Sequence, residues 1–186
     1  MKPIPAPTPA APTKISLAWL FGLMLCVGAR ADPASDYLQA SGQEKLVICS
    51  AAHRVLSERM LEDYEVAGKF SDVPGNWALY LTFHAVSVAE LELAKQRSGG
   101  QGAEGLFDEK ASAYRQLVPR MDATTRPLFG LHERFCKPEF NRMVKAGDYS
   151  QQMLEDIDAR EKPILEARLK AATEKGVKAR DARRAQ

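Results

Sequence analysis

The chain has 186 residues, of which 45% are hydrophobic, and its 26 Lys and Arg against 24 Asp and Glu give a formal net charge of +2. This length suits one domain with short extensions and excludes a large multidomain enzyme, and the hydrophobic content excludes a wholly disordered chain. A net charge this small does not indicate nucleic-acid binding, so we expect no nucleic-acid partner.

The first 31 residues have the pattern of a secretory signal peptide. Two lysines precede an apolar stretch, residues 15–29, that is short for a helix spanning a bilayer. Ala29-Arg30-Ala31 then gives the spacing of small residues that a signal peptidase accepts. We expect cleavage after Ala31, delivery of residues 32–186 to the periplasm or the exterior, and no transmembrane segment in this mature chain. The alternative is an uncleaved anchor.

Removal of the signal peptide changes the charge of the protein. Three basic residues and one of the three cysteines leave with it, so the net charge becomes −1 and the cysteines Cys49 and Cys136 remain. Residues 32–159 carry 14 basic and 20 acidic side chains, whereas residues 160–186 carry nine and four. The mature protein is therefore predicted to be an acidic body with a basic end.

The beginning of the mature chain predicts two helices. A short one follows Pro33, with Tyr37 and Leu38 packing inward. A long one begins at Ser41 and Glu44, which have the spacing of a capping box. Its apolar positions recur at spacings of three and four, which places them on one face: Leu46, Cys49, Ala52, Leu56 and Met60.

The middle of the chain predicts two more helices with a flexible break between them. The first runs from about Pro74 to Arg97 and is the most apolar, so we expect its His84 to lie in the core. The glycine-rich residues 98–102 separate it from a helix over about 103–118.

The last third predicts two long helical segments, each containing a proline. The first spans about 124–146, and we expect Pro138 to kink or split it, because proline lacks an N–H and clashes with the preceding turn. The second begins at Ser150, and we expect Pro163 to interrupt it. No segment alternates with a strand period for long. The predicted fold is all-α, an antiparallel bundle of four or five helices with one disulfide.

Apolar positions become sparse after Ala172, which predicts a helical domain over 32–172 and a frayed or disordered basic tail over 173–186. Six basic residues are candidates for electrostatic contacts at this end: Lys170, Lys175, Lys178, Arg180, Arg183 and Arg184. The tail is either a solvated terminus, or a weak contact for an anionic surface such as phospholipid head groups or an acidic partner, or a segment that folds back onto the acidic body.

Each mature cysteine has a histidine four residues away, in opposite order. Cys49 precedes His53, whereas His132 precedes Cys136, and this spacing puts both members of a pair on one helix face. If position 49 lies against 136 in antiparallel helices, position 53 lies against 132, because the two pairs of numbers have the same sum. We therefore predict that these two helices are antiparallel neighbours.

Two chemistries fit this arrangement. In an oxidising compartment a lone pair of cysteines forms a structural disulfide, and this interpretation requires no cofactor. The alternative is a four-ligand site for zinc or copper made by Cys49, His53, His132 and Cys136, since thiolate and imidazole suit those metals. A third arrangement keeps the disulfide and binds a metal weakly at His53 and His132 with Glu133.

No recognisable catalytic motif is present. The sequence lacks the Cys-x-x-Cys-His, His-Glu-x-x-His, Gly-x-Ser-x-Gly, phosphate-loop and Cys-x-x-Cys patterns. We therefore predict no catalytic residues and a small exported helical protein that binds another protein or serves the cell envelope. The alternatives are a metal-binding protein and an enzyme of unfamiliar type.

Overall fold

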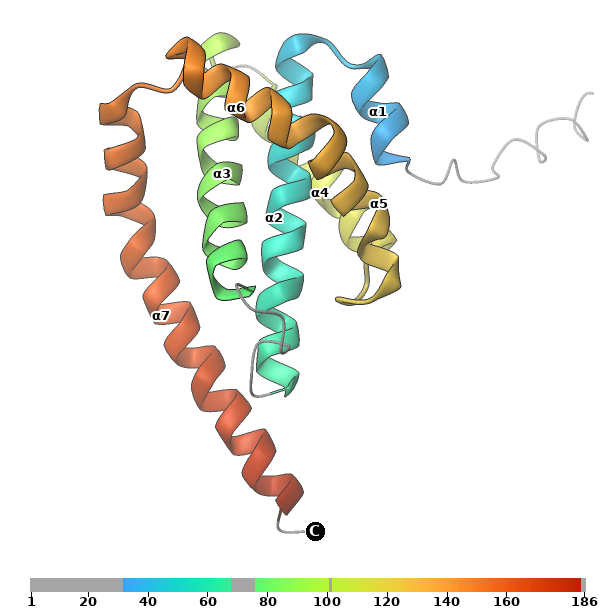
Figure 1. The fold of residues 1–186 in the computed structure, drawn as a ribbon, viewed down its shortest axis with the longest axis vertical. Helices are drawn as coiled ribbons and strands as arrows, with labels where there is room; N and C mark the ends of the chain where they lie inside the picture. The colour runs from blue at the N-terminus through green and yellow to red at the C-terminus, as the bar shows by residue number, and fades with distance from the viewer. Residues whose placement is uncertain (1–31, 68–75, 101, 185–186) are drawn as a thin grey trace, which may run out of the picture. The chain divides into compact units, whose positions relative to one another are not determined.

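The computed structural model describes residues 32–67, 76–100 and 102–184, and within these ranges all regular structure is helical. The helices are α1 (Pro33–Gln39), α2 (Gly42–Ala67), α3 (Asn76–Arg97), α4 (Ala103–Leu117), α5 (Arg126–Leu131), α6 (Lys137–Ala146) and α7 (Gln151–Arg184), with a 3-10 turn η2 (Ala123–Thr125) and a π-helical turn η3 (His132–Cys136) (Figure 1). The predicted all-α class is confirmed, although the chain is divided into more segments than four or five. The expected signal peptide lies outside the described residues. Among the helices that are described, none is both long and apolar enough to cross a membrane.

The helix ends follow local signals in the sequence. Ser41 N–H donates to the Glu44 carboxylate at 2.7 Å and Glu44 N–H donates to Ser41 Oγ at 3.4 Å, which is the predicted capping box of α2. α6 ends at Gly147, whose φ of +79° is the left-handed conformation that favours glycine. α7 begins after Ser150, whose hydroxyl accepts from Met153 N–H at 3.1 Å.

The two prolines have different effects. Pro138 lies in the first turn of α6, directly after η3, where Lys137 N–H donates to the His132 carbonyl five residues back. The regular α-helical pattern is therefore interrupted near Pro138, as predicted. Pro163 lies inside α7, so the interruption predicted there is wrong. Pro163 and Ala159, whose carbonyl loses its donor, are both exposed, and water can satisfy that carbonyl.

α2 is central to the described fold. It packs against α3, α4 and α7 and against the shorter α1, α5 and η3 (Figure 1). The Gln43 amide donates to the Ala94 carbonyl, and further along α2 the Ser50 hydroxyl donates to the Ser87 carbonyl. Since partner numbers fall along α3 as they rise along α2, these two helices are antiparallel.

α1 buries only one of its two predicted apolar contacts. Tyr37 is buried and its ring stacks on Phe135 with centroids 5.0 Å apart. Leu38 is 65% exposed, so the prediction that it packs inward is wrong. The buried residues of α1, Pro33 and Tyr37, are four positions apart and lie on one side of the helix, whereas Leu38 points about 100° away from Tyr37.

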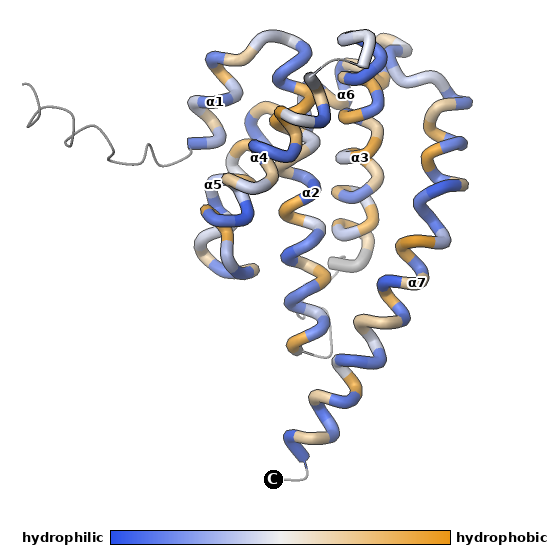
Figure 2. Tube along the Cα trace, turned by 180° about the vertical axis from the view of Figure 1, so that it is seen from behind, coloured by the Kyte–Doolittle hydropathy of each residue, from blue (hydrophilic) through white to orange (hydrophobic). Residues whose placement is uncertain are grey.

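α7 continues as a helix to Arg184, and no break separates a domain ending at residue 172 from the tail. Hydrophilic positions dominate its C-terminal half (Figure 2). Its buried residues form a narrow stripe: Ile157, Leu165, Ala172 and Gly176. The small residues at 172 and 176 extend the buried stripe past the last large apolar positions, a continuation that a search for large side chains does not detect.

The basic end of α7 lies against the last turns of α2. Three contacts join them: Thr173 Oγ1 and Tyr64 Oη at 3.0 Å, Lys175 Nζ and Glu65 Oε2 at 3.1 Å, and an Arg183 guanidinium N–H donating to the Val66 carbonyl, 3.1 Å between the heavy atoms. A basic segment therefore folds back onto an acidic part of the same chain. Residues 173–184 belong to the helix α7, and positions 185–186 of the predicted tail lie outside the described residues.

Candidate functional site

The two Cys–His pairs meet as their spacing predicts. The Sγ atoms of Cys49 and Cys136 are 2.07 Å apart, at disulfide distance, with Cα atoms 5.5 Å apart. His53 Nε2 lies 2.8 Å from His132 Nδ1. α2 and η3 are thus antiparallel neighbours, joined by a pair of sulfur atoms and a pair of imidazoles.

A glutamate on α3 completes this cluster. Glu90 Oε2 lies 2.8 Å from His53 Nδ1, and both side chains are only 1% exposed. The His132 ring is 15% exposed and its Nε2 lies 3.6 Å from the Glu133 carboxylate, beyond hydrogen-bond distance. Glu90, His53 and His132 therefore form a hydrogen-bonded chain from the interior towards the surface, hereafter the Glu90–His53–His132 chain.

Burial acts on the charges of His132 and Glu90, and the hydrogen bonds set the order of the protons. Burial lowers the pKa of His132 to about 4, and the nearby His53 ring and Lys137 ammonium add to this effect. Burial also raises the pKa of Glu90, opposed by its contact with His53. When each ring carries one proton and Glu90 is ionised, His53 Nδ1–H donates to the carboxylate and His132 Nδ1–H donates to His53 Nε2.

Packing around the chain holds the rings in place. Phe83 of α3 stacks on His53 with centroids 5.5 Å apart and an interplanar angle of 13°, and it meets His132 edge-on at 4.9 Å. On the same stretch of α2 and α3, Ser50 Oγ donates to the Ser87 carbonyl at 2.6 Å and Ser87 Oγ donates to the Ser50 carbonyl at 2.8 Å. These buried hydrogen bonds and ring contacts connect α2, α3 and η3.

This geometry bears directly on the metal hypotheses. In this arrangement the two sulfurs are joined to each other and both nitrogens of His53 have hydrogen-bond partners, so the four-ligand site of Cys49, His53, His132 and Cys136 requires a reduced and rearranged form. The weaker site with Glu133 would likewise have to break the bonds of His53. Within the described ranges, no three His, Cys, Asp or Glu side chains are placed to hold a metal ion.

The third histidine forms a second buried contact. His84 is 2% exposed, as expected for a core residue, and its Nε2 lies 2.9 Å from Glu161 Oε2 of α7. An Arg54 guanidinium N–H lies 3.4 Å from His84 Nδ1, which must then accept, so Nε2–H donates to Glu161. Burial lowers the pKa of His84. This contact links α2, α3 and α7.

Sequence reasoning did not identify Glu90 as a member of this cluster. Its signal was nevertheless present, because Glu90 occupies an apolar stretch of α3 in which Phe83, Ser87 and Ala94 at helical spacing are also buried. A carboxylate on the buried face of a helix needs a partner. Only the tertiary placement of α2 shows that this partner is His53.

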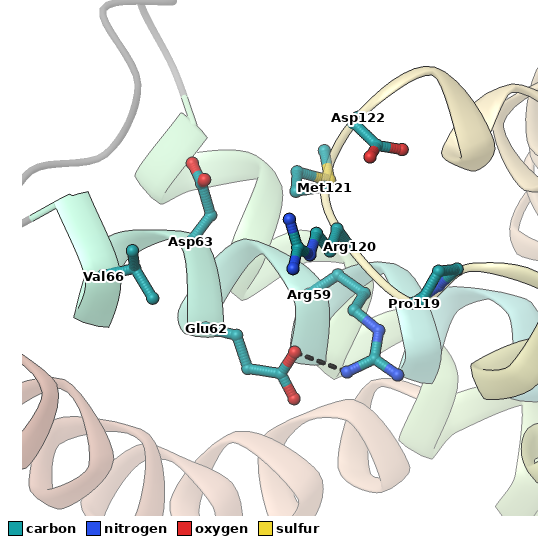
Figure 3. Close-up of a pocket in the computed structure, with 8 residues that line it drawn as sticks. All are labelled: Arg59, Glu62, Asp63, Val66, Pro119, Arg120, Met121 and Asp122. Atoms are coloured by element: carbon teal, nitrogen blue, oxygen red, sulfur yellow. Dashed lines mark hydrogen bonds and ion pairs between the residues drawn. The ribbon is translucent and has the colours of Figure 1, made fainter.

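A groove lies elsewhere, between the last turns of α2 and the loop before η2 (Figure 3). It has a volume of 540 Å³. Eight residues line it: Arg59, Glu62, Asp63, Val66, Pro119, Arg120, Met121 and Asp122. Charged groups of both signs therefore surround an apolar patch in one concavity, hereafter the α2 groove.

One wall of the α2 groove is held in place by Arg59. Its Nε–H donates to the Val118 carbonyl at 2.6 Å, a second N–H donates to the Arg115 carbonyl at 3.3 Å, and it pairs with Glu62. Arg59 therefore satisfies carbonyls at the C-terminal end of α4. By contrast, Arg120 and Asp63 have no ion-pair partner among the described residues, and Val66 is 70% exposed.

The six basic candidates at the end of α7 fall into two groups. Lys175 and Arg183 contact α2, as described above. The other four are exposed and make no ion pair with any described residue: Lys170, Lys178, Arg180 and Arg184. This second group is free for electrostatic contact with another molecule.

Comparison with protein family models, with curated proteins and with solved structures finds no match to this chain.

Proposed function

We propose that the protein is an exported, non-enzymatic binding protein of the periplasm or cell envelope, and that the α2 groove is where a partner binds. The observation that carries this proposal is the combination, in one groove, of a cation and a carboxylate that form no ion pair with any described residue and of an exposed apolar side chain: Arg120, Asp63 and Val66. Its 540 Å³ lies within the usual range of about 300–1,000 Å³ for binding sites.

The Glu90–His53–His132 chain has a different role in this proposal. Its three side chains form hydrogen bonds with one another, and the Glu90 carboxylate is buried. None of the three side chains lines the α2 groove. We assign it to the stability of the fold, where it fixes the relative positions of three helical segments.

The charges of the α2 groove indicate the chemistry of the partner. A guanidinium recognises a carboxylate with paired hydrogen bonds, and the carboxylates of Asp63 and Asp122 attract a basic group. Met121 lies between Asp63 and Asp122, and Val66 lies on the other side of Asp63 (Figure 3). We propose a peptide segment of a protein partner that carries an acidic and a basic side chain beside an apolar one.

Site-specific photo-crosslinking in exporting cells tests this proposal. A photoreactive residue replaces Val66 in the groove or, as a matched control, Leu38, which is equally apolar and 65% exposed on α1. We expect a discrete crosslinked product from position 66 only. Arg120→Ala and Asp63→Asn should each reduce it about tenfold, the effect of losing about 1.4 kcal/mol of binding free energy, whereas Arg126→Ala outside the groove should leave it unchanged. Identical products from both positions, or a product insensitive to Arg120→Ala and Asp63→Asn, would contradict the proposal.

A further inference from the structure

The exposed side of α7 carries opposite charges at its two ends. Three carboxylates lie within one turn near its start, all exposed: Glu155, Asp156 and Asp158, the last of which lines a groove against α3. Three cations lie within two turns near its end, also exposed, with the exposed carboxylate of Asp181 among them: Lys178, Arg180 and Arg184. Because the two clusters lie more than five helical turns apart along the helix, they cannot neutralise each other within a single chain.

The fold itself leaves these charges uncompensated. Glu155 and Asp156 accept hydrogen bonds only from the neutral amides of Gln151 and Gln152. Asp158 and the three cations have no ion-pair partner among the described residues. α7 turns its stripe of buried residues towards α2 and α3, so the opposite face is the one left free.

We propose that this free face binds a second copy of the same chain, with the two α7 helices antiparallel. A two-fold axis near residue 168 places the acidic cluster of each copy against the basic cluster of the other. Like charges would meet if the helices were parallel. In a two-fold interface every contact occurs twice, so one match of charges is made at both ends.

The register of this pairing follows from the positions of the charges. An axis near residue 168 requires that facing residues have numbers adding to about 336. Asp156 then lies opposite Arg180, and near the axis Glu166 lies opposite Lys170. Ala159 falls opposite Val177, which is 37% exposed, so a small apolar contact lies between the charged ends.

The interface uses residues that the rest of the molecule leaves free. Lys175 and Arg183 keep their contacts with α2, and none of the residues placed in the pairing lines the α2 groove. Self-association through α7 is therefore independent of the proposed function and compatible with it. Because each exposed pair of charges contributes little alone, the association should be reversible and strongly sensitive to salt.

Sedimentation equilibrium of the purified protein, together with two charge-reversal variants, tests this proposal. The first variant is Glu155→Lys with Asp156→Lys, and the second is Lys178→Glu with Arg180→Glu. In low salt the unaltered protein should be a dimer, and at about 1 M salt, where the screening length is about 3 Å, a monomer. Each variant alone should dissociate, with a dimerisation constant weakened at least about tenfold, because like charges then meet at both ends.

An equal mixture of the two variants separates the loss of charge complementarity from misfolding. In a mixed pair, the new lysines of one copy face the new glutamates of the other, and the original charges face each other at the second end. The mixture should therefore form dimers again, which a merely misfolded variant cannot do. A monomer in low salt, dimers that persist in either variant alone, or a mixture that stays monomeric would overturn the proposal.

Discussion

The region where α2 meets α3 and η3 and the region where α7 meets α2 are held by opposite kinds of polar contact. In the first, Glu90 and His53 are 1% exposed and sit beside a pair of sulfurs at bonding distance. In the second, Lys175 is 65% exposed and its partner Glu65 is 28% exposed. Both regions use acid–base pairs, and burial decides what each pair contributes.

The difference follows from the cost of desolvation. A buried carboxylate without its partner loses water and gains nothing in return, so removing one member of a buried pair is severely destabilising. An exposed ion pair remains in contact with water whether or not it forms, so its net contribution to stability is small. Salt weakens the attraction between its charges further. We therefore expect the fold to depend on the first region and the surface chemistry of the molecule on the second.

The largest effect is expected from the cysteines. Cys49→Ala with Cys136→Ala should lower the free energy of unfolding by up to about 4–5 kcal/mol, because the bond closes a loop with a sequence separation of 87. Urea unfolding with and without reductant measures this loss. Thiol titration of the native protein should find no free thiols until it is reduced; two free thiols with one bound zinc or copper ion would instead support the four-ligand site.

The buried carboxylate should come next. Glu90→Gln removes the carboxyl group that contacts His53 and should cost about 2–3 kcal/mol of unfolding free energy. Glu92→Gln is the matched control on the same helix, since Glu92 is 31% exposed and its loss should change stability by no more than about 0.5 kcal/mol. Chemical denaturation of both variants checks the comparison, and equal losses would show that burial is not the deciding factor.

The sequence could predict the meeting of α2 and η3 but not the whole cluster. The four-residue spacing in opposite order determines which residues face each other in an antiparallel pair. If Cys49 lies opposite Cys136, His53 must lie opposite His132. Glu90 comes from a third helix, and its partner depends on how α3 packs, which no local pattern records.

The same limit explains the errors at α7. Pro163 is tolerated because its side of the helix faces solvent, and a sequence does not show which side that is. Small residues such as Ala172 extended the buried stripe beyond the apolar pattern.

Lowering the pH is expected to have an intermediate effect on the free energy of unfolding. His132 has a pKa of about 4 in the folded protein against 6.5 ordinarily, so between these values the unfolded chain binds a proton that the folded ring does not. This contribution therefore lowers stability as the pH falls from 6.5 towards 4, by about 1–2 kcal/mol after allowing for the exposed edge of the ring. The stability advantage of the unaltered protein over His132→Asn should shrink across this range, and a constant difference would contradict the assignment.

The smallest effect is expected at the end of α7. Lys175→Ala with Arg183→Ala should cost at most about 1 kcal/mol, because both contacts are exposed. Most of that loss should vanish in high salt, which already screens the ion pair of Lys175. Lys145→Ala, which removes an exposed cation of α6 that makes no ion pair with any described residue, is the control and should leave thermal stability unchanged.

Native-state hydrogen exchange at low protein concentration tests the contrast between the two regions most directly. Amides of α2 and α3 around His53 and Glu90 should exchange only through global unfolding, at a free energy that salt leaves nearly unchanged. Amides of residues 173–184 should open at a lower free energy, which falls further as salt is added. Equal protection of both regions, with no dependence on salt at the end of α7, would contradict this account.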